Sequence, residues 1–307
     1  MSMIKKIKKF IMEPEIRKGY IVASGVFNWV SDETYIKAYF KSHLGYKPDL
    51  DNPKTLNEKL NWLKLYNRRP EYTTMVDKYK AKQFVAERIG AEHVVPLLGV
   101  WNTFDEIDFE SLPNSFVLKC THDGGPVICK DKKDFDKEYY RAVFEKKLKT
   151  NYFNASREWP YKNVERKIIA EEYIPSLGHR DSTEYKITCC NGKVKMITVC
   201  TGIAHASLDE RNNDHFDRDW NVIPMYAYYK NSGKEFAKPD NLDELIDISE
   251  KLAKDVPYLR VDLYDVDGHI YFGEMTFFTW GGWIRFNPPE YDRIMGDWVE
   301  LPEKYNQ

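Results

Sequence analysis

The chain has 307 residues, enough for two domains or for one large domain with a substantial core. Its 46 basic and 48 acidic residues give a net charge of −2, which argues against nucleic-acid binding as the main task because that class shows a basic excess. The five cysteines are odd in number and no pair has metal-ligand spacing, as is typical of reduced thiols in a cytoplasm.

Residues 1–12 are basic and carry Ile4, Ile7, Phe10 and Ile11 at helical spacing. The stretch lacks the apolar region that a signal peptide needs, and the chain has no run of about 20 apolar residues that would predict a membrane span. We expect an ordinary packed helix here, with a weak contact to a membrane surface as the alternative. The expected location is therefore the cytoplasm, with the inner face of the membrane as the alternative.

Residues 31–70 have a helical pattern. Thr55 and Glu58 have the spacing of a capping box, in which the hydroxyl and the carboxylate bind amide groups at a helix start. The sequence Arg68-Arg69-Pro70 predicts the end of this helical region.

A further helix is expected over residues 73–89, with Gly90 as its C-terminal cap. Asp77 and Lys78 lie near its beginning. A helix N-terminus carries a partial positive charge, so a lysine beside it can attract a phosphate. The alternative is a lysine that is simply solvated.

A strand over residues 112–120 places Lys119 near its end, and a second strand follows over 126–130. Gly124 and Gly125 in the loop between them would let backbone amides approach a phosphate closely. The pattern is not a Walker loop. An ordinary hairpin with a Gly-Gly turn is the alternative.

An apolar strand over residues 167–174 carries Glu171 and Glu172 toward its end. An acid in this position can accept a hydrogen bond from an adenine amino group or a ribose hydroxyl, whereas the alternative role is solubility of the strand end. A hairpin with an Asn-Gly turn follows over 183–200. Its Lys186 faces either the site or solvent. Helices are also expected over the charged amphipathic stretch 134–150 and over 241–254.

Two strands over residues 259–276 are predicted to form a hairpin, because Asp267-Gly268 suits a two-residue turn. This pairing brings Asp262 toward Glu274. Converging carboxylates repel each other unless a cation lies between them, and Mg²⁺ is the usual one, completed by water and phosphate oxygens. The alternative is a charged hairpin at a solvated sheet edge.

Two acidic pairs, Asp217-x-Asp219 and Asp265-x-Asp267, have the spacing that glycosyltransferases use for a metal and a nucleotide sugar. A glycosyltransferase is therefore the alternative function. It would need a series of alternating strands and helices, which the sequence does not show. A nucleotide-binding protein without catalytic activity is a third hypothesis.

Taken in order, these segments resemble the ATP-grasp superfamily, and most closely its TupA-like branch, which is associated with teichuronopeptide and capsular polysaccharide biosynthesis. The resemblance extends over roughly residues 31–285. The segments that carry it are Thr55–Trp62, Val76–Tyr79, Phe116–Lys119, Phe216–Trp220, Arg260–Tyr264 and Phe272–Thr276.

The resemblance implies an α+β, ATP-grasp fold in which two α+β subdomains clamp ATP. We expect a helical N-terminal region over residues 1–75. The N-terminal ATP-grasp subdomain with the glycine loop would span 76–170, and the C-terminal subdomain with the Mg²⁺-binding hairpin would span 171–307.

The resemblance also implies roles for individual residues. The nucleotide-binding set consists of Lys78, Lys119, Gly124, Gly125, Glu171, Glu172, Ile174 and Lys186. Lys78 and Lys119 would hold the phosphates, and the Glu171 side chain with the backbone of Glu172 and Ile174 would meet adenine. Asp262, Glu274 and Thr276 would form the metal site, although Thr276 stands where many ATP-grasp enzymes have Asn. Arg260 and Arg285 are the catalytic candidates, for the transferred phosphate or a substrate carboxylate.

The implied activity is ATP-dependent carboxylate–amine ligation through an acyl phosphate, with Mg²⁺ as the metal. The implied partners are a small-molecule carboxylate, such as a uronic acid or a nucleotide-linked sugar, and an amine or amino acid, for surface polysaccharide biosynthesis. No nucleic-acid partner is expected.

Overall fold

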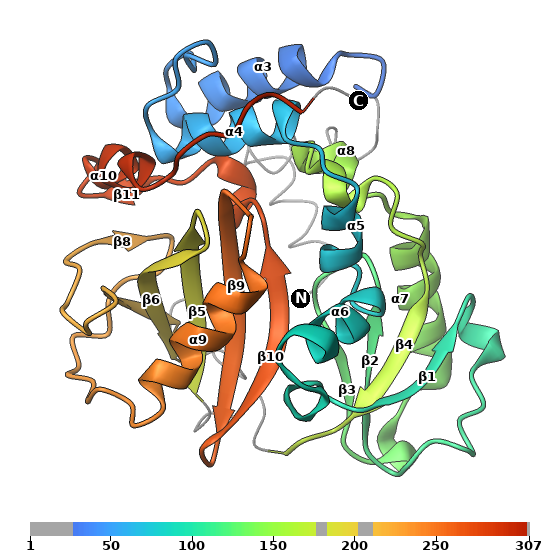
Figure 1. The fold of residues 1–307 in the computed structure, drawn as a ribbon. Coiled ribbons are helices and arrows are strands. Elements are labelled where there is room, and N and C mark those ends of the chain that lie inside the picture. The colour runs from blue at the N-terminus through green and yellow to red at the C-terminus, as the bar shows by residue number, and fades with distance from the viewer. Residues whose placement is uncertain (1–26, 176–182, 202–210, 306–307) are drawn as a thin grey trace.

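The computed structural model describes residues 27–175, 183–201 and 211–305. Within them the chain forms two lobes, each built on an antiparallel sheet (Figure 1). The α+β fold class is therefore confirmed. The N-terminal stretch 1–12 lies outside the described residues.

The first lobe is a four-stranded sheet in the order β1-β4-β2-β3. Its strands are β1 (Leu97–Trp101), β2 (Phe116–Cys120), β3 (Val127–Cys129) and β4 (Ile168–Glu172). Helix α7 (Lys137–Lys149) packs on this sheet, and its buried Phe144 joins a core of apolar residues from 104 to 170. We call this unit the four-stranded lobe.

The second lobe is a five-stranded sheet in the order β10-β9-β5-β6-β7. Its strands are β5 (Thr183–Cys190), β6 (Lys193–Thr201), β7 (Asn212–Phe216), β9 (Tyr258–Val266) and β10 (His269–Thr276). Helix α9 (Leu242–Leu252) covers one face (Figure 1), because Leu245, Ile248 and Leu252 lie on its apolar side. We call this unit the five-stranded lobe.

Two short helices, α5 (Glu71–Val76) and α6 (Lys80–Ile89), lie between the two sheets (Figure 1). The sequence predicted one helix over 73–89. The structure has two helices instead, because the Asp77 carboxylate accepts hydrogen bonds from the amides of Tyr79 and Lys80. These bonds interrupt the first helix and precede the start of the second at Lys80. Apolar residues of both helices join the core of the five-stranded lobe.

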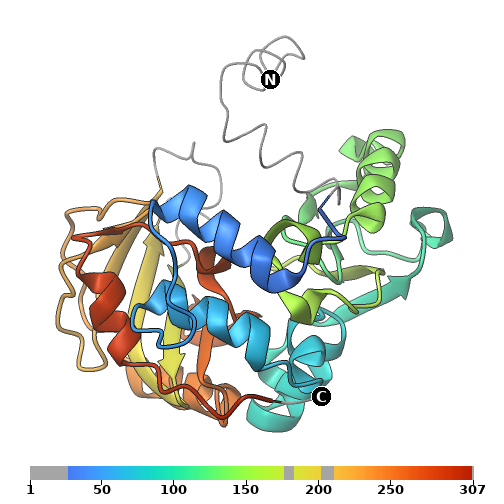
Figure 2. The same ribbon diagram turned by 90° about the horizontal axis from the view of Figure 1, so that it is seen from above.

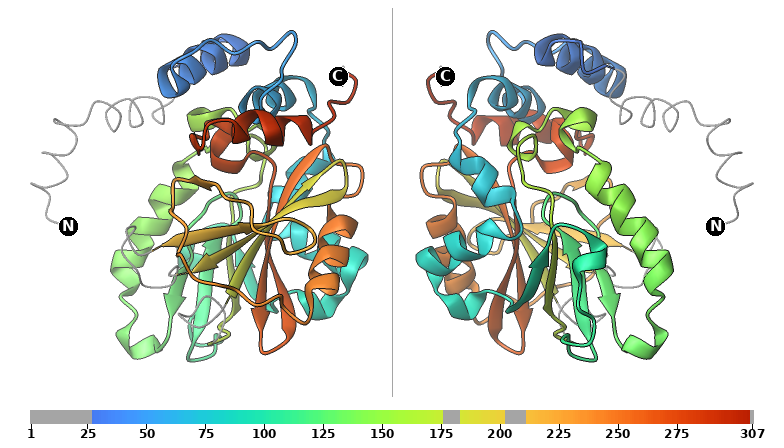
Figure 3. Two further views of the ribbon diagram at one scale, coloured as in Figure 1. Left: turned by 90° about the vertical axis from the view of Figure 1, so that its left-hand side faces the viewer. Right: turned by 90° about the vertical axis from the view of Figure 1, so that its right-hand side faces the viewer.

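Helices α3 (Asp32–Leu44), α4 (Leu56–Tyr66) and α10 (Tyr291–Asp297) gather at one end of the molecule (Figures 2 and 3). The predicted capping box of Thr55 and Glu58 is present at the start of α4. The continuous helical pattern over 31–70 is interrupted between Leu44 and Leu56, where Gly45 has a φ of 87° and ends α3. The shorter elements are α8 (Phe153–Ser156), β8 (Tyr226–Ala227) and β11 (Phe286–Asn287).

Both predicted hairpins are confirmed, with positive φ at Asn191 and Gly192 in one turn and at Asp267 and Gly268 in the other. The subdomain division at residues 75/76 and 170/171 stays a prediction. In the structure β4 runs through that second boundary to Glu172, inside the four-stranded sheet. Among the described residues, no helix is both long enough and apolar enough to cross a membrane.

Candidate active site

Glu171 forms one charged cluster in the four-stranded lobe. It lies on β4 opposite Val117 of β2, and its side chain is 6% exposed. Its two carboxylate oxygens bind Lys82 and Lys119, each at 2.5 Å. We call these three residues the lysine–glutamate cluster. It holds two cations for one anion, so it carries a formal excess of positive charge.

Burial alone would raise the pKa of Glu171, but the charges of Lys119 and Lys82 outweigh it and hold that pKa below its ordinary value. Burial lowers the pKa of Lys82, and Glu171 opposes that effect. The ion pairs therefore keep the Glu171 carboxylate ionised and engaged with the two lysines, rather than free to meet a ligand.

The glycine loop after β2 is anchored to α7. The ammonium of Lys147 donates to the Asp123 carboxylate at 3.0 Å and to the carbonyls of Gly124 and Gly125 at 3.1 and 2.9 Å. Gly125 has a φ of +85°, a conformation that other residues adopt at a cost. Lys147 thus occupies two carbonyls of the loop and fixes the loop against α7.

Lys78 lies at the break between α5 and α6 and connects the two lobes. Its backbone amide donates to the carbonyl of Thr121, next to the glycine loop, at 2.9 Å. Its ammonium lies 3.9 Å from Glu274 in the five-stranded lobe. The predicted proximity of Lys78 to a helix start is confirmed for α6, which begins at Lys80, and the Lys80 amide donates to the Asp77 carboxylate.

The second charged cluster lies on the hairpin of β9 and β10. Asp262 and Glu274 are paired across the strands, as predicted, next to an irregularity between Phe272 and Glu274. The guanidinium of Arg260 binds both oxygens of Asp262, at 2.6 and 2.7 Å, and Glu274 at 2.9 Å. The hydroxyl of Thr276 donates to Glu274 at 3.2 Å. An arginine therefore lies where the sequence predicted a cation between two acids.

Lys186 of β5 faces this cluster and not solvent. Its ammonium lies 2.9 Å from Asp262 and 2.6 Å from Glu184, and the Tyr264 hydroxyl donates to Glu184 at 3.2 Å. We call Glu184, Lys186, Arg260, Asp262 and Glu274 the hairpin cluster.

Asp262 lies at the centre of the hairpin cluster and is 1% exposed. Burial alone would raise its pKa, but Arg260 and then Lys186 hold that pKa below its ordinary value. Burial and ion pairing also act against each other on Lys186. Burial acts to lower its pKa, but the charge of Asp262 raises that pKa above the ordinary value. The cluster is a network of mutually dependent charges.

A pocket of about 450 Å³ opens between the lobes, and we call it the interlobe pocket. Six predicted site residues line it: Lys78, Gly124, Lys186, Arg260, Glu274 and Thr276. Its other walls include Tyr152, Glu158 and Tyr161 from the segment between α7 and β4, and Phe278 and Trp280 after β10. The structure thus brings predicted residues from both lobes to one cavity.

The donor set of the hairpin fits Mg²⁺. Mg²⁺ is commonly held by one or two carboxylates and takes its remaining oxygens from water and phosphates. Asp262 and Glu274 supply that number, with the Thr276 hydroxyl beside them. The described residues contain no group of three or more Asp, Glu, His or Cys side chains placed to hold a metal. A metal here would therefore depend on oxygens from a ligand and would compete with Arg260 for the two acids.

Other predicted residues lie apart from the interlobe pocket. Arg285 does not line this pocket and donates to the carbonyl of His43. The Glu172 amide donates to the carbonyl of Pro96 at 3.0 Å, so this amide is already occupied. Ile174 follows the end of β4 and is half-buried. The structure does not bring Arg285 to the hairpin cluster.

The sequence did not single out Lys82, Lys147, Glu184 or Glu158. Lys82 could have been found from its place one helical turn after Lys78, and Glu184 from strand alternation with Lys186. Lys147 and Glu158 meet the site only through tertiary packing, and no local pattern marks them.

The acidic pairs that suggested a glycosyltransferase stabilise turns. One oxygen of Asp217 accepts from the amides of Asp219 and Asn221, at 2.9 and 2.8 Å. Asp265 accepts from the amide of Gly268 and from the side chain of Asn241, each at 2.9 Å. These carboxylates have structural partners and lie outside the interlobe pocket.

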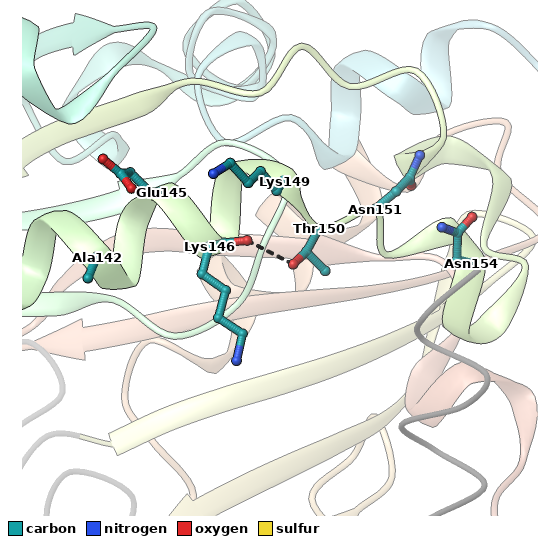
Figure 4. A pocket seen from close by; sticks show the side chains of 7 residues that line it. All are labelled: Ala142, Glu145, Lys146, Lys149, Thr150, Asn151 and Asn154. Carbon is teal, nitrogen blue, oxygen red and sulfur yellow. Dashed lines mark hydrogen bonds between the residues drawn. The ribbon is translucent and has the colours of Figure 1, made fainter. Parts of the chain in front are cut away.

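A second hollow of about 500 Å³ lies at the C-terminal end of α7 (Figure 4). It is lined by Ala142, Glu145, Lys146, Lys149, Thr150, Asn151 and Asn154. In it the Thr150 hydroxyl donates to the carbonyl of Lys146 at 3.0 Å, a bond within the helix end. None of the predicted site residues lines this hollow.

Comparison with known families gives one match. The model of the family described as TupA-like ATPgrasp matches residues 58–300, which is most of the chain. No curated protein has a sequence that matches this chain.

Among solved structures, an L-amino acid ligase from Bacillus licheniformis aligns with 80% of this chain and 55% of its own, at 14% identity and a TM-score of 0.43. A D-alanine–D-alanine ligase from Bacillus anthracis, complexed with ATP, aligns with 66% of this chain and 54% of its own, at 17% identity and a TM-score of 0.39. An N5-carboxyaminoimidazole ribonucleotide synthetase in its ADP complex aligns with 66% and 45%, at 14% identity and a TM-score of 0.39. The chain spans about half the length of these structures.

Proposed function

Because the chain belongs to the TupA-like ATP-grasp family, we propose that it is an ATP-dependent ligase that joins a carboxylate to an amine. The observation that carries this proposal is the convergence of Lys78, Gly124, Lys186, Arg260 and Glu274 on the interlobe pocket. Lys78 and the glycine loop lie on one side, and Lys186, Arg260 and Glu274 lie on the other. Cations, loop amides and carboxylates are the groups that a nucleotide triphosphate with its metal requires.

In this proposal the substrate carboxylate attacks the γ-phosphorus of ATP, forming an acyl phosphate and ADP. An amine then attacks the carbonyl carbon and phosphate leaves. Both reactants of the first step are anions, so the main demand on the protein is to neutralise charge. Lys78 and Arg260 line the pocket as the cations for the phosphates, and Lys186 supports them from β5.

Asp262 and Glu274 would hold Mg²⁺, which when bound would neutralise phosphate charge. The two acids would then exchange Arg260 for the metal, leaving the guanidinium for the phosphate that is transferred. Thr276 would orient Glu274 through the hydrogen bond that they share.

Lys147 would keep the glycine loop over the phosphates by holding its carbonyls. A covered pocket protects an acyl phosphate from water. The lysine–glutamate cluster would lie at the nucleotide side, where its excess positive charge attracts an anion.

The finer part of the proposal is the substrate: a uronic acid or a nucleotide-linked sugar acid as the carboxylate, and an amino acid as the amine, for a surface polysaccharide. The support for it is the family alone. A cytoplasmic location, where ATP is present, belongs to the same proposal.

The test is ADP release by the purified protein with MgATP and a panel of uronic and other carboxylic acids, each with and without amino acids. We expect ADP release that requires an acid and ends in an amide. Turnover of a nucleotide sugar without ATP would overturn the proposal.

A further inference from the structure

Four acids line the interlobe pocket, and three of them are committed to cations. Asp123 lies 3.0 Å from Lys147, Glu184 lies 2.6 Å from Lys186, and Glu274 lies 2.9 Å from Arg260. A carboxylate held in an ion pair is a weak proton acceptor, because the cation stabilises its ionised form.

Glu158 is the exception. Within residues 27–175, 183–201 and 211–305 it forms no ion pair, and its hydrogen-bond partner is the hydroxyl of Ser156, which donates to Oε1 at 2.6 Å. Burial raises the pKa of Glu158, and the charge of Lys64 opposes this effect without reversing it. A carboxylate with these properties in a pocket is suited to take a proton.

Ser156 and Lys64 fix the position of Glu158. Lys64 of α4 is fully buried and donates to the carbonyl of Ser156 at 2.8 Å, to Asn61 at 3.2 Å and to the carbonyl of Gly281. Ser156 in turn holds one oxygen of Glu158. This chain of contacts ties the carboxylate to the turn after β10 that forms another wall of the pocket.

His122 is the rival proton acceptor, since it also lines the pocket. Its Nε2 lies 3.1 Å from the carbonyl of Lys147 and is therefore the nitrogen that carries the proton. Its Nδ1, the remaining acceptor, is buried from solvent. The geometry therefore favours Glu158.

We propose that Glu158 is the general base that deprotonates the incoming amine, an inference that rests on the proposed ligase function. The Glu158 carboxylate takes one proton from the ammonium form of the amine. The neutral nitrogen forms a bond to the carbonyl carbon of the acyl phosphate. The carbon–oxygen bond to phosphate then breaks, the second proton leaves the nitrogen with the phosphate, and Glu158 returns its proton to water. Ser156 and Lys64 are positioning residues in this step.

The experiment replaces the amine with hydroxylamine, which is largely neutral at neutral pH and needs no base. MgATP and D-glucuronate are supplied with either hydroxylamine or L-alanine. ADP, the hydroxamate and the amide are measured for wild type, Glu158→Gln, Ser156→Ala and His122→Asn. General base catalysis contributes about 100-fold to 10,000-fold to a rate.

We expect Glu158→Gln to lower amide formation by about 100-fold or more while hydroxamate formation stays within about threefold of wild type. Ser156→Ala, which keeps the carboxylate but removes its orienting hydrogen bond, should lower amide formation by about tenfold and leave hydroxamate formation unchanged. His122→Asn should leave the ratio of amide to hydroxamate formation as it is in wild type, whatever it does to binding.

Equal loss of amide and hydroxamate in a folded Glu158→Gln protein would overturn the inference, because it would assign Glu158 to acyl phosphate formation. Full retention of amide formation would overturn it as well. A selective loss in Ser156→Ala would support it even if Glu158→Gln fails to fold. If wild type forms no hydroxamate, the proposed function fails first, and the inference fails with it.

Discussion

The two charged clusters differ in their balance of charge. The lysine–glutamate cluster places two cations around one buried acid. The hairpin cluster sets Arg260 and Lys186 against Asp262, Glu184 and Glu274. The lysine–glutamate cluster can therefore attract an anion through its excess positive charge, whereas the carboxylates of the hairpin cluster can bind a cation. A nucleotide with its metal presents both anionic phosphates and a cation, so the two clusters offer charges that complement its two parts.

Asp262→Asn is expected to have the largest effect. It removes the acid between Arg260 and Lys186 and leaves two cations buried with too little negative charge. We expect the free energy of unfolding to fall by about 3–5 kcal/mol and ADP release to fall by about 100-fold or more. Denaturant unfolding and an ADP assay check the two parts. As the control, Glu172→Gln changes an exposed acid and should shift the unfolding free energy by less than about 0.5 kcal/mol.

The hairpin cluster should bind Mg²⁺ appreciably only when a nucleotide is present, because Arg260 occupies both acids. MgATP at 100 times its Kd should stabilise the protein by about 2.7 kcal/mol, whereas Mg²⁺ alone should leave the melting temperature nearly unchanged. Thermal melts with Mg²⁺, ATP, both, and both with excess chelator make the comparison. Strong stabilisation by Mg²⁺ alone would show that the acids are not committed to Arg260.

Glu171→Gln tests the other cluster. Lys82 and Lys119 lose their shared anion, and we expect the unfolding free energy to fall by about 1–3 kcal/mol at neutral pH. The folded-state pKa of Glu171 is below its ordinary value of 4.5, so its contribution is present above that value and is lost as the pH falls below it through the folded pKa. The difference between wild type and variant should therefore shrink below about pH 4.5. A difference that grows on acidification would contradict the ion-pair assignment.

Lys147→Met should have a smaller effect, confined to ligand binding. The glycine loop loses the ammonium that holds Asp123 and two carbonyls. The loop must then be ordered when ATP binds, and this ordering weakens ATP binding. We expect the KM for ATP to rise about tenfold, with little change in kcat. The neighbouring Lys146→Met removes an exposed ammonium of the same helix and is the matched control.

Asp217→Asn is expected to have the smallest effect on activity. Asp217 holds a turn outside the interlobe pocket, so ADP release should match wild type. A glycosyltransferase that used Asp217 for a metal would instead lose its activity. Asp219→Asn changes the other acid of this pair, and we expect the same unchanged ADP release.

The parts of the fold that the sequence predicted are those fixed by neighbours in the chain. The Asp267-Gly268 turn sets the register of β9 and β10, and this register places Asp262 opposite Glu274. The capping box of Thr55 and Glu58 is likewise local.

The parts that could not be predicted depend on contacts between segments far apart in the chain. Arg260 was expected to meet a phosphate, but without a ligand its best partners are the two acids beside it. Lys147 meets the glycine loop from a helix that begins more than ten residues later. Glu158 faces the pocket only because Ser156 and Lys64 hold its segment there.

The two nitrogen atoms of Lys78 contact different lobes. Its amide nitrogen is bound to Thr121 beside the glycine loop, and its side-chain nitrogen reaches toward Glu274. The two ¹⁵N nuclei of this one residue therefore sense different lobes. If the lobes close around a nucleotide as two rigid bodies, the ammonium resonance should shift strongly while the amide resonance stays close to its place. A single labelled lysine would in this way record the relative motion of the two lobes in solution.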